Sequence, residues 1–265
     1  MLITLITDFG NADYFVGAMK GVILSINSEA RVVDITHEIP PQDIRAGAFT
    51  LLAAYKTFPP QTIHVCVVDP GVGSKRRPVL VLGGGQFFVG PDNGIFSHVY
   101  EREADHRVFH LTSEQYFRQP VSATFHGRDV FAPVAGALSK GVEPEELGNE
   151  IEDYVRLPRL APLVAADGNL TASIIHIDHF GNCVTNLTPQ DLTEEMVARG
   201  VRLVVGGAEI TSFRNFYAEG TASESELFAI WGSAGFLEIA AFRGCAARLL
   251  DAQTGQSVEV KREKG

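Results

Sequence analysis

Two aspartates each follow an apolar run typical of a buried strand, at positions where a carboxylate could bind a ligand. The first, Asp8, comes directly after the run Leu2–Thr7 and is followed by Phe9 and Gly10. Ligands of open α/β sheets bind beyond the carboxyl ends of the strands, where a carboxylate can accept two hydrogen bonds from a diol. The alternative is that Asp8 caps the helix that follows. A kinase motif is excluded, because no glycine-rich loop, paired lysine or HRD motif accompanies the DFG.

The second aspartate, Asp69, ends the β-branched run Thr62–Val68 and precedes a turn rich in proline and glycine. That turn brings two arginines, Arg76 and Arg77, back toward the carboxylate. The segment lacks the GxxxxGK[ST] spacing and the following helix of a phosphate-binding loop. A carboxylate and a guanidinium seven residues apart could hold and orient a small polar reactant. The alternative is a strand-end turn with solvated basic residues.

A third polar cluster surrounds His126, which lies between Phe125 and the pair Arg128 and Asp129. Histidine is the side chain most readily used for proton transfer near neutral pH. The alternative is structural: Asp129 could cap the apolar helix that follows, with His126 and Arg128 on the surface.

A fourth cluster lies in the second half of the chain, where Asp178, Phe180 and Asn182 share one loop at the end of a strand. This set of an acid, an aromatic ring and an amide can stack a base, hydrogen-bond its edge and hold an ammonium group. The alternative is a polar β-turn.

The elements that must position these side chains differ between the two halves of the chain. In the first half, strand-like runs alternate with stretches of helical periodicity, which predicts an α/β domain with a central, mostly parallel sheet. The predicted strands are Leu2–Thr7, Val32–Thr36, Thr62–Val68, Pro78–Leu82 and Gln86–Val89. The predicted helices are Tyr14–Ile26, a stretch opened by Pro41, Ile95–Tyr100 and Asp129–Leu138.

The second half has the pattern of an all-β domain, a small barrel or sandwich, because short strand-like runs recur with turn residues between them. These runs are Thr171–Ile177, Cys183–Leu187, Arg202–Val205, Glu226–Trp231, Phe236–Ala240 and Ser257–Val260. Only Glu194–Arg199 indicates a helix. We therefore expect an α/β domain over residues 1–157 and a smaller, barrel-like β domain over residues 163–265, joined by a proline-containing linker.

Composition excludes several classes of protein. The net charge of −10 argues against a nucleic-acid-binding protein, which needs a basic surface to meet phosphate. No apolar run approaches the length of a membrane span, and the N-terminus lacks the basic region of a signal peptide. The cysteines (Cys66, Cys183 and Cys245) are three in number, far apart and without a paired motif. A reduced, cytoplasmic setting is expected, with neither a disulfide framework nor a zinc site.

The four polar clusters, in this order, resemble one known family. Together they are similar to the S-adenosyl-L-methionine (SAM) hydrolases that form adenosine, also called SAM hydroxide adenosyltransferases. These enzymes are relatives of the SAM-dependent fluorinases and chlorinases. The resemblance extends from about Leu2 to Val260. It implies a homotrimer in which the substrate lies between the N-terminal domain of one subunit and the C-terminal domain of its neighbour.

The resemblance also implies roles for individual residues. Asp69, Arg76 and His126 would form a triad that positions and activates water. The remaining site residues would bind SAM: Asp8 the two ribose hydroxyls, Asp178 and Ser233 the methionine end, Phe180 and Asn182 the adenine side, Asp13 the methionine ammonium, Phe125 the substrate pocket, and Phe216 or Tyr217 the adenosine as a cover. The chain departs from the family pattern at Phe242, where an asparagine is expected.

The chemistry implied by this resemblance suits these residue types. The sulfonium of SAM is already a good leaving group, so the enzyme must supply a nucleophile in line with the C5′–S bond, and neither a metal nor an organic cofactor is needed. An aspartate beside an arginine stays ionised, so His126 or the coupled group is the favoured acceptor of the water's proton. A carboxylate at Asp69 would repel an incoming halide, which argues against halogenation.

Two alternatives remain open at this level. One is a different enzyme, such as a nucleosidase or an amidohydrolase that uses His126 with Asp129. The other is a SAM or adenosine sensor that keeps the fold and the pocket without catalysing a reaction.

Overall fold

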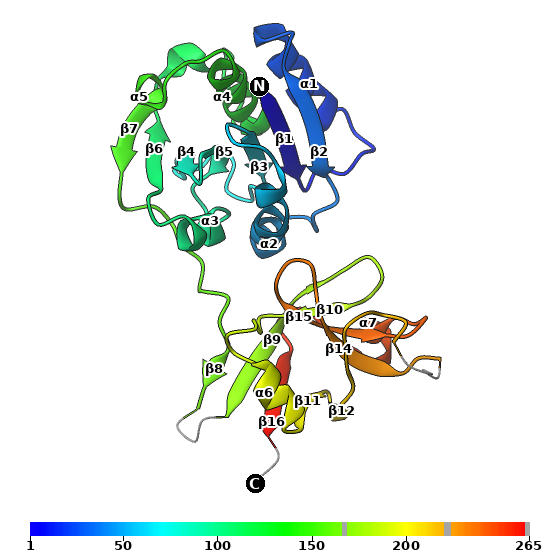
Figure 1. Ribbon diagram of the computed structural model, residues 1–265. Helices are drawn as coiled ribbons and strands as arrows, with labels where there is room; N and C mark the ends of the chain where they lie inside the picture. Colours follow the sequence, from blue (N-terminus) through cyan, green and yellow to red (C-terminus); the bar gives the residue numbers. More distant parts are fainter. Residues whose placement is uncertain (166–168, 220–223, 263–265) are drawn as a thin grey trace. The chain divides into compact units, whose positions relative to one another are not determined.

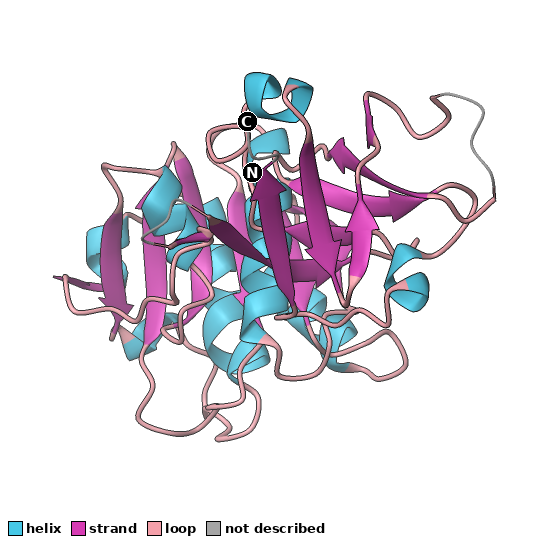
Figure 2. Cartoon of the chain, turned by 90° about the horizontal axis from the view of Figure 1, so that it is seen from below, coloured by secondary structure: helices cyan, strands magenta, loops and turns pink. Residues whose placement is uncertain are grey.

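The computed structural model describes residues 1–165, 169–219 and 224–262, so residues 263–265 of the predicted second domain lie outside it. The chain divides into two compact units, Met1–Arg159 and Leu160–Gly265 (Figure 1). The first has helices around a sheet and the second is built mainly of strands. Figure 2 colours the helices of the chain cyan and its strands magenta. This confirms the predicted fold class. Among the described residues, no helix is long and apolar enough to cross a membrane.

A seven-stranded mixed sheet forms the centre of the first unit. The strands β2, β1, β3 and β5 are parallel neighbours, and β4, β6 and β7 then continue the sheet with antiparallel pairing. In spatial order their bounds are β2 Arg31–Thr36, β1 Leu2–Thr7, β3 Ile63–Val67, β5 Gln86–Pro91, β4 Pro78–Gly83, β6 Arg107–Leu111 and β7 Gly148–Ile151. The sequence analysis did not predict β6 or β7. Strand β7 is short, polar and at the edge of the sheet, so it carries no apolar periodicity.

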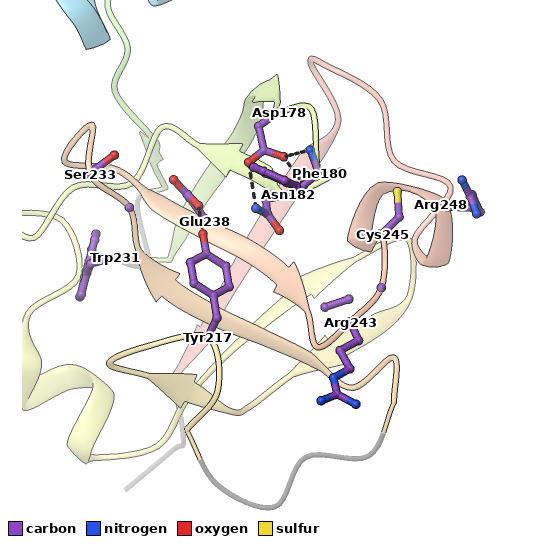
Figure 3. A pocket seen from close by; sticks show the side chains of 13 residues that line it. Asp178, Phe180, Asn182, Tyr217, Trp231, Ser233, Glu238, Arg243, Cys245 and Arg248 are labelled. Atoms are coloured by element: carbon purple, nitrogen blue, oxygen red, sulfur yellow. Dashed lines mark hydrogen bonds between the residues drawn. The ribbon is translucent and has the colours of Figure 1, made fainter.

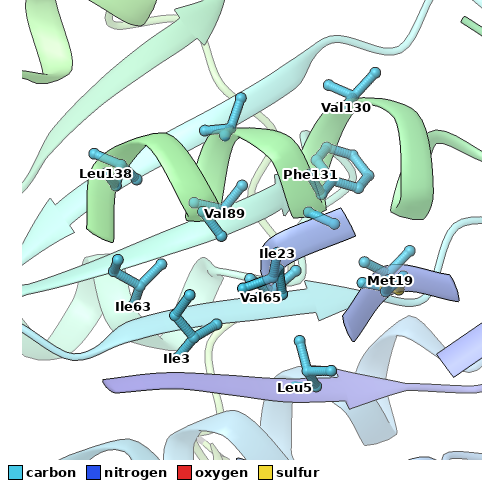
Figure 4. Packing of buried hydrophobic residues seen from close by; sticks show 14 of the residues in the cluster. Ile3, Leu5, Met19, Ile23, Ile63, Val65, Val89, Val130, Phe131 and Leu138 are labelled. Atoms are coloured by element: carbon cyan, nitrogen blue, oxygen red, sulfur yellow. The ribbon is translucent and has the colours of Figure 1, made fainter. Parts of the chain in front are cut away.

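Helices cover both faces of this sheet because successive side chains of its inner strands alternate between two cores. One core contains Ile3 and Leu5 of β1 with α1 (Phe15–Ile26) and α4 (Ala132–Ser139). Figure 4 shows Met19 and Ile23 of α1 packed there against strand residues, with α4 above them. The other core contains Ile6 of β1 together with buried residues of α2 (Ile44–Ala54) and α3 (Ser97–Arg102).

The start of α2 differs from the sequence prediction. The helix begins at Ile44 and not at Pro41, because Gln42 has a left-handed backbone conformation (φ 67°) that a helix does not allow. The side chain of Asp43 instead caps the helix, accepting a hydrogen bond from the Ala46 backbone N–H at 2.9 Å.

The other helical segments of this unit are short. The predicted helix at 95–100 is observed as α3, two residues later. The predicted helix at 129–138 is observed as a π-helical turn, Gly127–Phe131, that leads directly into α4. The remainder are α5 (Pro144–Leu147) and the 3-10 turns Tyr55–Thr57 and Glu114–Tyr116.

A curled sheet with the strand order β12-β11-β16-β9-β10-β15-β14-β13 forms the second unit, and β8 adds to β9. Its terminal part folds back so that β12 contacts β14, which gives the barrel-like shape that the sequence predicted. The bounds are β8 Leu163–Val164, β9 Leu170–Ile177, β10 Cys183–Thr185, β11 Val201–Val205, β12 Ala208–Ile210, β13 Phe213–Arg214, β14 Leu227–Trp231, β15 Leu237–Ala241 and β16 Ser257–Arg262.

Two short helices accompany this sheet, α6 (Glu194–Ala198) and α7 (Ala246–Leu249). The expectation of a single helix in this half is therefore wrong. Helix α7 is only four residues long, too short for a periodic pattern to identify.

Two glycines on the facing helices α1 and α4 should respond to alanine with opposite signs. Around Gly21 there is open space, so Gly21→Ala should raise the free energy of unfolding by about 0.5–1 kcal/mol through helix propensity. A Cβ at Gly136 would lie 3.0 Å from Ile26, so Gly136→Ala should lower it despite the same gain in propensity. Chemical denaturation measures both. Equal effects at the two positions would contradict the observed α1–α4 packing.

Candidate active site

Two of the predicted site aspartates lie at the carboxyl ends of neighbouring parallel strands. Strands β1 and β3 pair with Thr7 opposite Val67, so Asp8 and Asp69 follow at the same edge of the sheet. The chain leaves β1 for β2 on one side and returns to β3 on the other, which makes this the topological switch point of the sheet. Ligands of doubly wound sheets bind in the crevice at such a point.

A buried ion pair closes the loop that follows β3. The Arg76 guanidinium binds the Asp69 carboxylate side-on: Nε donates to Oδ1 at 2.9 Å and to Oδ2 at 3.0 Å, and Nη2 donates to Oδ2. The two side chains are only 9% and 4% exposed. In a pair with this geometry, each charge compensates part of the loss of water around the other.

His126 extends this ion pair to a hydrogen-bonded series of three side chains, Asp69, Arg76 and His126. Its Nδ1 lies 2.7 Å from Nη2 of Arg76. An arginine can only donate, so Nδ1 is the acceptor and the ring's proton is on Nε2. Burial, and then the positive charge of Arg76, lower the pKa of His126. The imidazole is therefore neutral near pH 7, and protonation of Nδ1 would require the loss of its bond to Arg76. This geometry argues against the expectation that His126 accepts the water's proton.

One N–H donor among these three side chains lacks an acceptor. Nη1 of Arg76 is buried and has no hydrogen-bond partner among the residues that the structure describes. A buried, unpaired N–H of a charged group costs free energy, which a small oxygen ligand such as water would recover. The three side chains thus present an orphan donor at Arg76 Nη1, while the Nε2–H of His126 lies on the side of the ring away from the guanidinium.

The loops that carry Arg76 and His126 are in close contact. Gly73 has a left-handed conformation (φ 76°), and a Cβ there would lie 2.2 Å from the backbone oxygen of Ala123. Only glycine can adopt this backbone conformation and leave room for the Ala123 oxygen.

The neighbouring Arg77 points away, to Asp92 and Asp153 at 2.8 Å each, so the structure identifies Arg76 as the arginine that binds Asp69.

The other predicted residues of this unit have varied surroundings. Asp8 accepts a hydrogen bond from the Gln42 backbone N–H at 2.8 Å through one oxygen, and Asp13 is exposed. The Phe125 ring is 6% exposed and packs edge-to-face on Phe15, with centroids 5.2 Å apart. Phe125 therefore supports the position of the adjacent His126 from within the core.

Asp129 does not form a dyad with His126. Its fully buried carboxylate accepts hydrogen bonds from the Arg128 side chain at 2.6 and 2.8 Å and from the Ser122 backbone N–H at 2.9 Å. These bonds hold together the loop before α4 and lower the pKa of Asp129 despite its burial. The alternative of an amidohydrolase using His126 with Asp129 loses its geometric basis.

The second unit contains a pocket of about 840 Å³ (Figure 3). Five predicted residues line it: Asp178, Phe180, Asn182, Tyr217 and Ser233. Phe216, the alternative to Tyr217, is not among the lining residues. The sequence analysis missed other lining residues, among them Trp231, Glu238, Arg243, Cys245 and Arg248. A charged residue inside the apolar run Phe236–Ala240 was the available signal for Glu238.

The loop that carries three of these residues is organised by Asp178. Its Oδ1 accepts from the backbone N–H groups of Phe180 and Asn182 at 2.9 and 2.8 Å, and its Oδ2 accepts from Asn182 Nδ2 at 2.8 Å. The Phe180 ring is 74% exposed at the pocket and presents a flat apolar surface there. Phe242, where the sequence resemblance led us to expect asparagine, packs against the buried residues Phe228 and Ile230.

A second carboxylate faces this pocket. The Tyr217 hydroxyl donates to Oε2 of Glu238 at 3.0 Å (Figure 3). Burial raises the pKa of Glu238, and the negative charge of Asp178 acts in the same direction. Burial and the Glu238 carboxylate raise the pKa of Tyr217 to about 12. Among the described residues, no group of three or more His, Cys, Asp or Glu side chains could hold a metal ion.

A buried chain of carboxylate, guanidinium and imidazole at the switch point of an α/β sheet has the character of an enzyme active site. Residues 3–148 match the family model of the SAM hydroxide adenosyltransferase N-terminal domain, and residues 172–259 match that of the C-terminal domain. The chain therefore belongs to the SAM hydroxide adenosyltransferase family.

Curated relatives cover nearly the whole chain. The (R)-S-adenosyl-L-methionine hydrolase of Methanocaldococcus jannaschii is 36% identical over 98% of this chain and 95% of its own length. The hydrolase of the same name from Thermus thermophilus is 37% identical over 96% and 97%. A fluorinase of Nocardia brasiliensis is 25% identical over 98% of this chain and 96% of its own length. An uncharacterised protein of Thermotoga maritima has a similar crystal structure, with a TM-score of 0.89 and 33% identity over 99% of this chain and 100% of that one.

The titration of His126 tests the hydrogen-bonded arrangement of Asp69, Arg76 and His126 in the absence of substrate. NMR of the ring nitrogens should show a proton on Nε2 and a pKa below that of an ordinary histidine. In Arg76→Gln the pKa should rise, because the neighbouring cation that favours the neutral ring is gone. Arg77→Gln is the matched control and should leave the pKa of His126 unchanged. A proton on Nδ1, or an equal response to both substitutions, would contradict the arrangement.

Proposed function

We propose that this protein hydrolyses SAM to adenosine and L-methionine. The oxygen of a water molecule attacks C5′ of the ribose in line with the C5′–S bond. The electron pair of that bond passes to sulfur, which leaves as the neutral thioether of methionine, and the water loses one proton. The observation that carries the proposal is the buried Asp69–Arg76–His126 chain with its orphan donor at Arg76 Nη1. Membership of the family and the names of the hydrolase relatives support it.

Arg76 supplies a donor to the nucleophile, and neither Arg76 nor His126 removes the proton of the water. Nη1 of Arg76 would donate to the oxygen of the water, which favours its hydroxide form, while Nδ1 of His126 helps to fix the orientation of the guanidinium. The cation of Arg76 lowers the pKa of a water bound to it, since it stabilises the developing negative charge. Asp69 keeps the guanidinium in place, and the proton of the water passes to the solvent. The sulfonium needs no acid, metal or organic cofactor to leave.

A buried carboxylate beside the nucleophile also selects water over a halide. Asp69 would repel an anion that enters the site without its hydration shell, whereas it can accept a hydrogen bond from water. This favours hydrolysis over the reaction named for the fluorinase relatives, to which the chain is less similar.

The substrate is proposed to be the (R)-sulfonium epimer, since the curated hydrolase relatives carry that name. We further propose a homotrimer in the cytoplasm, in which the N-terminal unit of one subunit and the C-terminal unit of its neighbour share each active site. The presence of the triad on one unit and of the pocket on the other supports this sharing.

Mixed trimers of Asp69→Asn and Phe180→Ala subunits should then recover activity that neither variant has alone.

Product analysis tests the proposed reaction. Wild-type protein incubated with separated (R)- and (S)-SAM should release adenosine and methionine in equal amounts, faster from the (R) epimer. Asp69→Asn should reduce the rate at least about 100-fold, because the guanidinium loses its anchor and the water its orientation. Asp92→Asn, which removes the buried one of the two carboxylates that bind Arg77, is a control for the loss of an ion pair. Saturable SAM binding without adenosine would contradict the hydrolase and favour a sensor, and release of adenine would indicate a nucleosidase.

A further inference from the structure

A buried histidine lies beside the turn that carries Asp8. His37 directly follows β2, is only 3% exposed and lies next to the end of β1. Its ring Nδ1 lies 2.8 Å from the hydroxyl oxygen of Thr7, which also accepts a hydrogen bond from the Phe9 backbone N–H at 3.2 Å. The backbone oxygen of His37 accepts from the Gly10 N–H at 2.8 Å. His37 is therefore bonded to the chain on both sides of Asp8.

Two charged side chains hold the other side of the His37 ring. Nε2 lies 3.1 Å from Oδ1 of Asp34, and Oδ2 of Asp34 accepts a hydrogen bond from the Lys20 ammonium on α1. Nε2 has no aligned hydrogen-bond partner among the described residues, so its contact with the carboxylate is electrostatic. A carboxylate favours a proton on the nitrogen that faces it, which leaves Nδ1 for the Thr7 hydroxyl. The series Lys20, Asp34, His37 and Thr7 thus runs from the surface to the end of β1.

An irregularity in the pairing of β1 with β2 allows this arrangement. Leu5 pairs with Asp34 whereas Ile6 pairs with Thr36, so β2 contains one extra residue. Residues three apart lie on opposite faces of a regular strand, but the extra residue lets Asp34 and His37 approach each other. Bulges of this kind are common next to active sites, where they redirect a side chain.

The orientation of Asp8 matters under the proposed function, because the family resemblance assigns both ribose hydroxyls to this carboxylate. One of its oxygens accepts a hydrogen bond from the Gln42 backbone N–H at 2.8 Å, and the residue is only half-buried. To accept two hydroxyls at once, the carboxylate must keep one orientation. The backbone on either side of Asp8 sets that orientation, and His37 binds this backbone.

We infer that His37 is a positioning residue for Asp8, because it fixes the turn 7–10 so that the carboxylate meets both ribose hydroxyls. This inference rests on the proposed function for the identity of the ligand. In this role His37 acts through Thr7 and Gly10, without contact to the ligand. Replacement of His37 should therefore weaken the binding of ribose hydroxyls and leave the binding of a ligand without them unchanged.

Calorimetry with adenosine and with 2′,3′-dideoxyadenosine, which keeps the base and lacks both hydroxyls, tests this role. Wild-type protein should bind adenosine at least about tenfold more tightly, as expected for hydrogen bonds to a charged group. In His37→Leu this preference should fall to about threefold or less, while the affinity for the dideoxy nucleoside stays the same. His37→Asn, whose amide can still reach the Thr7 hydroxyl, should keep most of the preference.

The matched control is His64, a second buried histidine of the same sheet. Its Nδ1 lies 2.7 Å from the Thr4 hydroxyl oxygen, in the middle of β1 and not at its end. His64→Leu removes the same kind of buried contact, so it should leave the preference for adenosine unchanged. Should His37→Leu not fold, as judged by circular dichroism, Thr7→Val with Thr4→Val as its control tests the same link.

Several results would overturn the inference. These are an equal loss of affinity for both nucleosides in His37→Leu, an unchanged preference in that variant, the same loss of preference in His64→Leu, and the absence of any preference in wild type. If wild-type protein releases no adenosine from SAM, the proposed function fails instead, and the comparison of the two nucleosides still decides the role of His37.

Discussion

The guanidinium of Arg76 is the group on which the proposed active site depends. It binds the Asp69 carboxylate on one edge and the His126 ring on another, and its last nitrogen is left buried without a partner among the described residues. Each contact fixes a property of the next: the carboxylate fixes the guanidinium, and the guanidinium fixes the tautomer of the imidazole. A planar group with five donors in a rigid arrangement can do this, whereas a lysine ammonium could not.

The fold serves this interaction by bringing three distant segments to one edge of a sheet. The parallel pairing of β1 and β3 delivers Asp8 and Asp69 to the switch point, and the two cores on either face hold those strands in register. The His126 segment arrives through the π-helical turn that begins α4, held by the hydrogen bonds of Asp129. The Asp129 carboxylate, which sequence alone left open as a catalytic group, thus has a positioning role. The second unit contains a pocket lined by aromatic, amide and carboxylate groups, which we propose binds the substrate.

Much of the fold follows from local patterns in the sequence. The runs Leu2–Thr7 and Thr62–Val68 are apolar because both faces of their strands are covered, and they were therefore predicted almost residue by residue. Edge strand β7 and helix α7 were missed, since a four-residue polar strand and a four-residue helix contain too little periodicity. The start of α2 was misplaced because Pro41 is a common first helical residue, while the left-handed Gln42 that prevents it has no mark in the sequence.

The site was predictable where residue types carry the chemistry and not where geometry decides it. Asp69 stood out after an apolar run, Arg76 after the turn that follows it and His126 in a polar cluster before an apolar helix. The choice between Arg76 and Arg77 and the acceptor role of His126 Nδ1 required the structure. Glu238 was overlooked because its run reads as an ordinary strand, and only its register places the carboxylate in the pocket.

The transfer of ¹⁸O from labelled water to adenosine, followed by mass spectrometry in wild type and in Arg76→Lys, tests the central claim most directly. The account predicts label in the 5′ hydroxyl and none in methionine, formed by wild type and at least about 100-fold more slowly by the variant. Unlabelled adenosine, or an undiminished rate with lysine at position 76, would contradict it.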